Sequence, residues 1–137
     1  MRKKPVLLIV EDDLLLAETM IKKFSSVGFE VELAPNGYAA IKMLESITPQ
    51  VILLDILLPI KNGFDILSEI KSDSKLSEIP VIIASNLDTE GDINKGFSLG
   101  AADYIVKSNL SLNDLVQKVS FLMNNSKHGR EFLAHNK

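Results

Sequence analysis

The fold is decided by one short stretch of the chain, Val51-Ile52-Leu53-Leu54-Asp55. A continuous apolar run of this length is typical of a parallel β-strand that is buried on both faces of a sheet. The run ends abruptly at a carboxylate, where a buried strand would emerge from the core. We therefore predict a central strand over residues 51–54, with Asp55 at its carboxyl end.

Apolar runs of the same kind recur along the chain, at residues 6–10, 81–84 and 104–106. The segment 29–33 differs from them, because its apolar residues alternate with Glu30 and Glu32. Such alternation predicts a strand with one more exposed face, as at the edge of a sheet. The chain therefore contains five candidate strands.

Segments with apolar residues at helical spacing separate the strands and predict five helices. These segments are residues 14–24, 40–47, 64–70, 88–100 and 112–122. Strands that alternate with helices imply a parallel sheet with helices on both faces, and right-handed crossovers make a doubly wound arrangement the default. We predict an α/β fold with a five-stranded parallel sheet in the order 2-1-3-4-5.

The composition fits a single globular domain. The chain has 137 residues, of which 46% are hydrophobic and 24% are charged, and its net charge of −3 does not suggest binding to nucleic acid or membranes. The absence of cysteine excludes disulfides, thiolate metal sites and cysteine catalysis. The first apolar run is shorter than a signal-peptide core, and no run reaches the length of a membrane span, so we expect a cytoplasmic protein.

Charged or hydroxyl-bearing side chains that could take part in catalysis or binding follow four of the predicted strands. The acidic run 11–13 follows the first strand, Asp55 the third, Ser85 the fourth and Lys107 the fifth. In a sheet of the predicted order, ligands bind beyond the carboxyl ends of the strands, near the point where the order reverses. We expect these side chains to gather at one rim of the sheet.

A rim of this composition suits phosphoryl chemistry. Carboxylates that share a site resist ionisation unless a cation is present, and Mg²⁺ is a hard ion that takes oxygen ligands. Asp55 could attack phosphorus as a carboxylate nucleophile. Lys107 and the Ser85 hydroxyl could hold the phosphoryl oxygens.

Four motifs with these residues occur in order along the chain, at residues 10–13, 53–59, 80–85 and 100–107. Together they resemble the receiver domains of bacterial response regulators, over roughly residues 6–122. The resemblance implies a flavodoxin-like sheet and a function in two-component signal transduction, as a phosphoprotein of the phosphorelay. It implies a phosphoacceptor that assists its own phosphorylation and dephosphorylation, rather than an enzyme.

The resemblance also implies a metal site for Mg²⁺, with Mn²⁺ as a substitute. Asp12 matches the direct metal ligand of the family, and Glu11 matches the acidic residue that acts through water. Asp55 and the backbone carbonyl of Leu57 would complete the protein's contribution. These assignments rest on the family's pattern and not on spacing alone.

The same resemblance assigns the phosphoryl site and a switch. Asp55 matches the phosphoacceptor, and Ser85 and Lys107 match the hydroxyl and lysine that bind the phosphoryl group. Tyr104 matches the aromatic switch residue, which turns inward when the hydroxyl residue moves toward the phosphate. A phosphoryl group on Asp55 would thus alter the surface formed by the fourth and fifth strands.

The partners implied are a sensor histidine kinase or a phosphotransfer protein as donor. A second copy of the chain or a downstream protein would bind the face of the fourth and fifth strands, with no direct contact with nucleic acid or membrane. We expect the receiver domain to occupy residues 1–123. Residues 124–137 are expected to form a polar tail or linker stub, in which His128 and His135 have no assigned role.

The chain departs from the family's pattern at four positions, one of which is Asn86, which replaces a common small residue after Ser85. Ser108 stands where the family usually has proline, and a cis bond before a non-proline residue costs about 3–4 kcal/mol, so we expect the Lys107–Ser108 bond to be trans. Leu57 and Leu87 occupy positions that are often polar in the family. They would keep water from the phosphoryl group, unless they face a partner-binding surface instead.

Simpler interpretations remain for individual residues. An aspartate, asparagine or serine after a strand is often only a helix cap, and we favour that interpretation for Asp13, Asn36 and Asp88. Thr89 is the alternative cap for the helix that runs to Gly100. Two other functions also remain: a hydrolase with an aspartate nucleophile, and a degenerate receiver that only binds partners. Hydrolases of that kind usually carry a second aspartate two residues after the nucleophile, and Leu57 occupies that position here.

Overall fold

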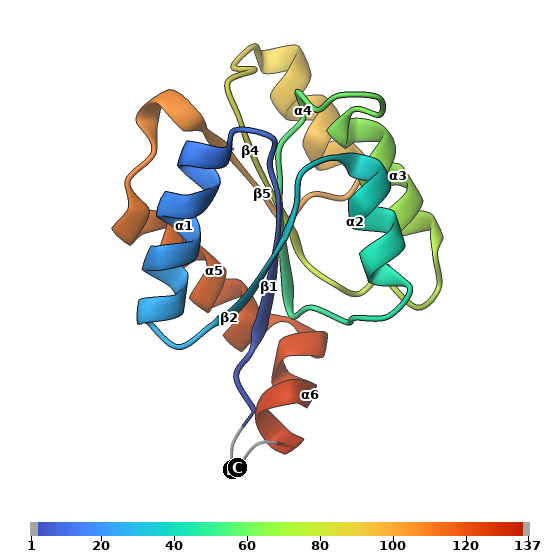
Figure 1. Cartoon of the computed structure of the whole chain (residues 1–137). Coiled ribbons are helices and arrows are strands. Elements are labelled where there is room, and N and C mark those ends of the chain that lie inside the picture. Colours follow the sequence, from blue (N-terminus) through green and yellow to red (C-terminus); the bar gives the residue numbers. More distant parts are fainter. Residues whose placement is uncertain (1–2, 136–137) are drawn as a thin grey trace.

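Five parallel strands form the central sheet of the computed structural model, which describes residues 3–135 (Figure 1). The strands are β1 (Val6–Val10), β2 (Glu30–Ala34), β3 (Val51–Leu54), β4 (Val81–Ser85) and β5 (Asp103–Val106). Their order across the sheet is β2-β1-β3-β4-β5, and every neighbouring pair is parallel. The predicted α/β fold and strand order are confirmed.

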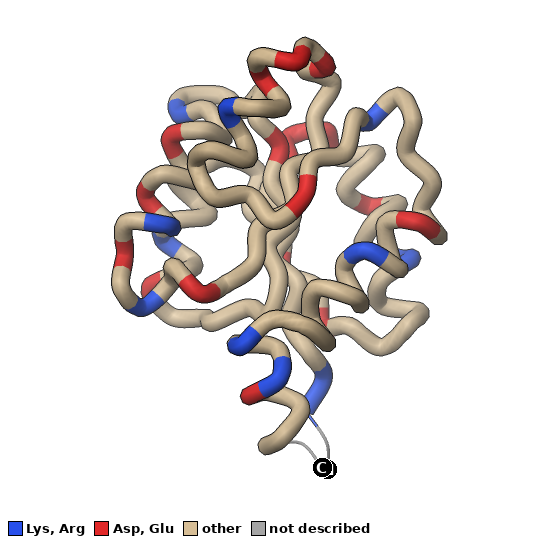
Figure 2. Tube along the Cα trace, turned by 180° about the vertical axis from the view of Figure 1, so that it is seen from behind, with Lys and Arg blue, Asp and Glu red and all other residues tan. Residues whose placement is uncertain are grey.

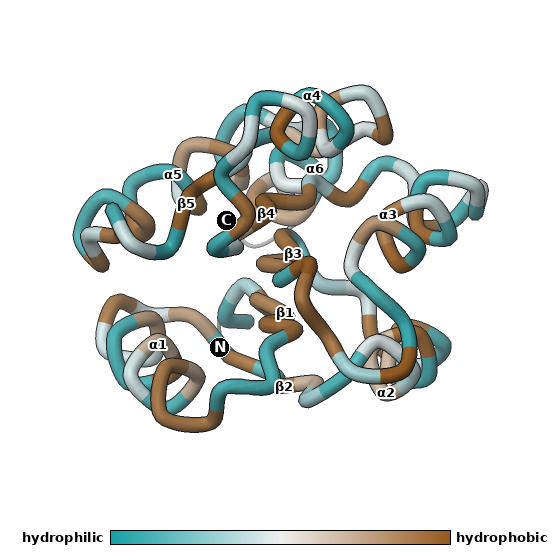
Figure 3. Tube along the Cα trace, turned by 90° about the horizontal axis from the view of Figure 1, so that it is seen from above, coloured by the Kyte–Doolittle hydropathy of each residue, from teal (hydrophilic) through white to brown (hydrophobic). Residues whose placement is uncertain are grey.

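Helices cover both faces of this sheet. They are α1 (Leu14–Ser26), α2 (Gly37–Leu44), α3 (Gly63–Ser72), α4 (Glu90–Ser98), the 3₁₀ turn η1 (Lys107–Asn109), α5 (Leu112–Asn125) and α6 (Lys127–His135). Helices α1 and α5 lie on one face, and α2, α3 and α4 lie on the other (Figures 1 and 3). This arrangement places the turns that follow each strand at one end of the molecule.

The sheet separates two apolar cores, because successive side chains of a strand point to opposite faces. In β3, Ile52 and Leu54 pack toward α2 and α3, whereas Val51 and Leu53 pack toward α1 and α5. Every residue of β3 and β4 is buried, as expected for strands between two helical layers. In β2, by contrast, Glu30 is exposed, which confirms the edge position predicted from its alternating pattern.

Polar side chains begin the helices, as predicted for two of three positions. Asp13 accepts hydrogen bonds from backbone N–H groups at the start of α1, and Asn36 does the same for α2. The cap of α4 is Thr89 and not Asp88. The Thr89 hydroxyl accepts from the Asp92 N–H and donates to the Asp92 carboxylate, a reciprocal pair that an aspartate one position earlier does not form.

The C-terminal segment was expected to be a polar tail, and the structure places helix there. Helix α5 continues to Asn125, and α6 folds back beneath the amino ends of the strands, at the end of the molecule opposite the turns (Figure 1). Gly129 is buried where α6 crosses α5, and a Cβ atom there would collide with the backbone of Met123. The sequence pattern missed α6 because its few apolar residues do not form a full stripe.

No helix within residues 3–135 combines the length and the apolar content that crossing a lipid bilayer requires.

Candidate functional site

Three carboxylates meet beyond the carboxyl ends of β1 and β3. One oxygen atom from each of Glu11, Asp12 and Asp55 lies within 4.8 Å of the others. Glu11 and Asp55 are buried, whereas Asp12 is exposed. The cluster therefore has two members in the protein interior and one at its opening to solvent, at the end of the molecule seen face-on in Figure 3.

Backbone hydrogen bonds of the sheet hold Glu11 and Asp55 in place. The Glu11 N–H donates to the carbonyl of Ala34, and the Asp55 N–H donates to the carbonyl of Val10. Both residues thus continue the hydrogen-bond pattern of the sheet by one position. The two buried carboxylates are therefore positioned by the ends of β1 and β3, which is the arrangement that a precise site needs.

Lys107, from the end of β5, reaches across to the two buried carboxylates. Its Nζ lies 2.5 Å from Glu11 Oε1 and 2.8 Å from Asp55 Oδ2, and its side chain is only 13% exposed. Part of the repulsion expected among the carboxylates is therefore already neutralised by this ammonium group. The remaining oxygens accept backbone hydrogen bonds, Glu11 Oε2 from Asp13 N–H and Asp55 Oδ1 from Leu57 N–H.

Burial and hydrogen bonding shift the pKa values of both Glu11 and Lys107. Burial raises the pKa of Glu11 above its ordinary 4.5, and the hydrogen bonds from Lys107 and the Asp13 N–H only partly offset this. Burial by itself lowers the pKa of Lys107, but its hydrogen bonds to Asp55 and Glu11 outweigh that effect and raise the pKa above 10.5. Lys107 is therefore a fixed positive charge at physiological pH.

Ser85 and Tyr104 are joined through the backbone of one residue in the turn between β4 and α4. Ser85 is fully buried at the end of β4, and its hydroxyl accepts a hydrogen bond from the Leu87 N–H at 3.4 Å. The Tyr104 hydroxyl donates to the Leu87 carbonyl at 2.7 Å. Burial raises the pKa of Tyr104, and the nearby carboxylates of Asp92, Asp55 and Asp88 add to this effect.

The two leucines of the site occupy different environments. The Leu57 side chain is 55% exposed, beside Asp55. The Leu87 side chain is half-buried and packs against the core that lies under α2, α3 and α4. Within residues 3–135 no peptide bond is cis, so the expected trans bond between Lys107 and Ser108 is confirmed.

Sequence reasoning missed the role of Gly63, which lies against the backbone of Asp55. A Cβ atom at Gly63 would collide with the backbone carbonyl oxygen of Asp55, so only glycine lets α3 begin this close to the end of β3. The turn before it contains Ile60, whose φ of 71° is unusual for a β-branched residue. Asn62-Gly63 is a turn-forming pair in the sequence, but such a pair does not indicate the contact with Asp55.

Charged groups are distributed unevenly over the molecule. Figure 2 shows several acidic residues at the end that holds the turns after the strands, and lysine and arginine residues around α6 at the opposite end. His128 and His135 belong to α6 and lie away from the carboxylates.

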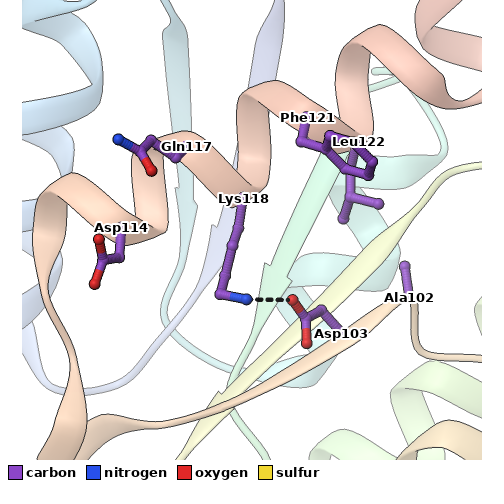
Figure 4. Close-up of a pocket in the computed structure, with 7 residues that line it drawn as sticks. All are labelled: Ala102, Asp103, Asp114, Gln117, Lys118, Phe121 and Leu122. Carbon is purple, nitrogen blue, oxygen red and sulfur yellow. Dashed lines mark hydrogen bonds and ion pairs between the residues drawn. The ribbon is translucent and has the colours of Figure 1, made fainter.

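A surface hollow of about 560 Å³ lies apart from the carboxylates, between β5 and α5 (Figure 4). Lys118 and Asp103 form an ion pair of 3.0 Å within it, and Phe121 exposes its ring beside them. Its lining combines the apolar side chain of Leu122 with the polar side chains of Asp114 and Gln117.

The carboxylate cluster fits a hard divalent cation. Its donors are oxygen atoms, its most exposed member, Asp12, has no hydrogen bond or ion pair among the described residues, and the Lys107 ammonium balances only one of three negative charges. Mg²⁺ is usually held by one or two carboxylates and keeps several of its waters, which an open cluster of this kind allows.

A profile of the family described as response regulator receiver domain matches residues 7–120. The chain is 36% identical over 117 residues to the transcriptional regulatory protein CusR of Escherichia coli, covering 85% of this chain and 50% of CusR. It is 35% identical over 117 residues to the probable transcriptional regulatory protein SilR of Salmonella typhimurium, with the same coverage. The chain thus spans about half the length of these curated relatives.

Solved structures agree in fold. The phosphorylated cyanobacterial phytochrome response regulator RcpA is 32% identical, with a TM-score of 0.76 over 88% of this chain and 91% of RcpA. A CheY-like receiver domain protein from Methanospirillum hungatei has a TM-score of 0.84 over 94% of this chain and 99% of its own, at 22% identity, and shows the shared fold alone.

Proposed function

The chain belongs to the response regulator receiver domains of two-component signalling, and from this premise we propose that Asp55 is its phosphoacceptor. The observation that supports the proposal most directly is the Lys107 ammonium, which lies 2.8 Å from Asp55 Oδ2 inside the carboxylate cluster. Incubation with acetyl phosphate and Mg²⁺ tests it, because the intact mass of the chain should rise by a single phosphoryl group.

The donor in the cell would be a phosphohistidine on a sensor histidine kinase or a phosphotransfer protein. A carboxylate oxygen of Asp55 attacks phosphorus, a P–O bond forms, the P–N bond to histidine breaks, and the released imidazole nitrogen takes up a proton. The product is an aspartyl phosphate. The domain is a phosphoacceptor module rather than a conventional enzyme.

Mg²⁺ would be held by Asp12, Asp55 and the backbone carbonyl of Leu57, with Glu11 acting through water. When bound, the ion supplies positive charge that neutralises the phosphoryl oxygens. Lys107 is already aligned on Asp55, so its ammonium can transfer a hydrogen bond from the carboxylate to a phosphoryl oxygen. The Ser85 hydroxyl would hold another oxygen.

The signal would leave the site through the Ser85–Leu87–Tyr104 connection. A hydroxyl that turns toward the phosphoryl group gives up its hydrogen bond with the Leu87 N–H, and Tyr104 is bonded to the carbonyl of the same residue. The face around β4 and β5 would then present a changed surface to a downstream protein or a second copy of the chain. We place the receiver domain in residues 1–123 and the protein in the cytoplasm.

Metal binding should be visible in thermal stability. Asp12→Asn should raise the melting temperature by about 2–5 °C without divalent ions, because it removes the carboxylate that Lys107 does not neutralise. Millimolar Mg²⁺ should stabilise the parent chain and not this variant, since the ion binds only the folded state with its carboxylates intact. Asp13→Asn, at the neighbouring helix cap, should respond to Mg²⁺ like the parent. A parent chain indifferent to Mg²⁺ would count against the site.

The phosphorylated form should be long-lived. Hydrolysis needs a water held in line behind phosphorus, and neither Leu57 nor Leu87 has a side chain that can orient one. Leu57→Asn and Leu87→Glu should speed the loss of the phosphoryl group by about tenfold or more, measured by intact mass after desalting. Leu15→Asn, at an exposed leucine of α1, is the control. If the polar variants decay at the parent's rate, the leucines act as interface residues.

A further inference from the structure

Gly96 of α4 lies directly against the ring of Tyr104. It is buried, and a Cβ atom built on it would lie 3.0 Å from Tyr104 Cδ2 and 2.7 Å from Ile83 Cδ1. Glycine is a poor choice for a helix interior, since it has more conformational freedom to lose than any other residue. Its place in α4 therefore calls for a packing reason, and the ring supplies one.

The position of this ring matters because of what its hydroxyl binds. Tyr104 donates to the Leu87 carbonyl, and the Leu87 N–H donates to the Ser85 hydroxyl. One residue of the turn therefore connects the aromatic ring to the hydroxyl of Ser85. This connection is already made in a chain whose Asp55 pairs with Lys107 and carries no phosphoryl group.

We propose that Gly96 is a positioning residue for Tyr104, because the missing Cβ keeps open the space in which the ring lies when its hydroxyl bonds the Leu87 carbonyl. A side chain at position 96 would push the ring outward and break that bond. The placement of the ring stands on the packing alone; its effect on signalling rests on the proposed function of Asp55.

A methyl group at position 96 has two neighbours that could give way. Ile83 is fully buried in β4 among core residues, where close packing leaves its Cδ1 little room to move. The Tyr104 ring is only half-buried and has solvent on one side. The ring is therefore the neighbour that moves, and overpacking is relieved by its rotation outward.

The chain offers a direct spectroscopic test, because it contains two tyrosines and no tryptophan. Tyr38 is exposed on α2, so Tyr38→Phe leaves Tyr104 as the only tyrosine without disturbing the core. In this background, Gly96→Ala should lower the ratio of inward to outward rings by about tenfold, or about 1.4 kcal/mol. The acrylamide quenching constant of the tyrosine fluorescence should rise accordingly.

The matched control is Gly91→Ala in the same helix. A Cβ atom there would meet only Thr89 Oγ1, at 4.0 Å, so the quenching constant should stay at the parent value. The double variant Gly96→Ala/Ile83→Val removes the Cδ1 contact, relieves crowding that could impair folding, and should still expose the ring. Quenching of Gly96→Ala at the parent value, or its restoration in the double variant, would overturn the proposal.

Phosphoryl uptake separates this proposal from the function of Asp55. Gly96→Ala should take up a phosphoryl group from acetyl phosphate to the same extent as the parent. The nearest neighbours of a Cβ atom at position 96 belong to Ile83 and Tyr104, and not to the carboxylates or Lys107. If neither protein gains mass, the proposed function fails, while the quenching result still decides the role of Gly96.

Discussion

Asp55→Asn should abolish the gain in mass on incubation with acetyl phosphate and Mg²⁺. The amide has no negative oxygen to attack phosphorus, yet it matches the carboxylate in shape and keeps an oxygen that can accept from the Leu57 N–H. It also removes one charge from a crowded cluster, so the variant should remain folded. Circular dichroism would show that lost uptake is not lost structure.

The control for this experiment is Asp13→Asn. Asp13 lies at the same rim, two residues after Glu11, but its side chain caps α1, a role that asparagine fills equally well. Asp13→Asn should gain a phosphoryl group like the parent. Equal gain by Asp55→Asn would show that another residue is the acceptor, and loss in both variants would show that uptake depends on the rim as a whole.

The fold was predictable because each level of the sequence agrees with the next. The apolar runs in β1, β3 and β4 are long enough for a strand and too short for a membrane-spanning segment. The segments between them carry apolar residues at helical spacing. Once the strand order is known, the residues after each strand must share one rim. For this reason Glu11, Asp12, Asp55 and Lys107 could be grouped before any distance was known.

Features that depend on distances between elements could not be predicted. The pattern of residues 100–107 marks Lys107 but does not show that its ammonium reaches two carboxylates at once. In the sequence, Gly63 and Gly96 look like any glycine of a turn or a helix. The need for glycine at these positions is seen only from their contacts, with the backbone of Asp55 and with the ring of Tyr104. Helix α6 was missed because it is stabilised by packing against α5 at Gly129, not by its own pattern.

Lys107→Met should destabilise the chain by about 3 kcal/mol at neutral pH, since removing one partner of a buried ion pair leaves the other charges uncompensated. Glu11 and Asp55 are almost wholly buried, so water cannot replace the ammonium fully. For a chain of this size the melting temperature should fall by about 10 °C. Methionine retains most of the apolar stem, so the loss reports mainly on charge.

Lys118→Met is the matched control for this substitution. Lys118 also forms an ion pair, with Asp103 at 3.0 Å, but its side chain is 48% exposed. Exposed pairs contribute about 0–1 kcal/mol, because water and salt screen them. Lys118→Met should therefore melt within a few degrees of the parent, by about 4 °C at most.

The dependence on pH distinguishes lost charge from lost packing. The pKa of Glu11 in the folded state is raised above its ordinary 4.5. Between pH 4.5 and this raised pKa, the folded state therefore binds more protons than the unfolded state, and the free energy of unfolding falls as pH rises. Without Lys107, whose hydrogen bond lowers the Glu11 pKa, this window widens upward. Lys107 itself stays protonated over this window in the parent, because its charge is lost only as pH rises through its raised pKa, above 10.5.

The deficit of Lys107→Met should therefore shrink as the pH is lowered from neutral toward the raised pKa of Glu11, because a protonated Glu11 no longer repels Asp55. Urea unfolding of the parent and the variant across this range measures the difference in free energy at each pH. A deficit that stays constant with pH would mean that methionine perturbs packing alone. In that case the ammonium does not stabilise the buried carboxylates, and its alignment on Asp55 in the unphosphorylated chain is incidental.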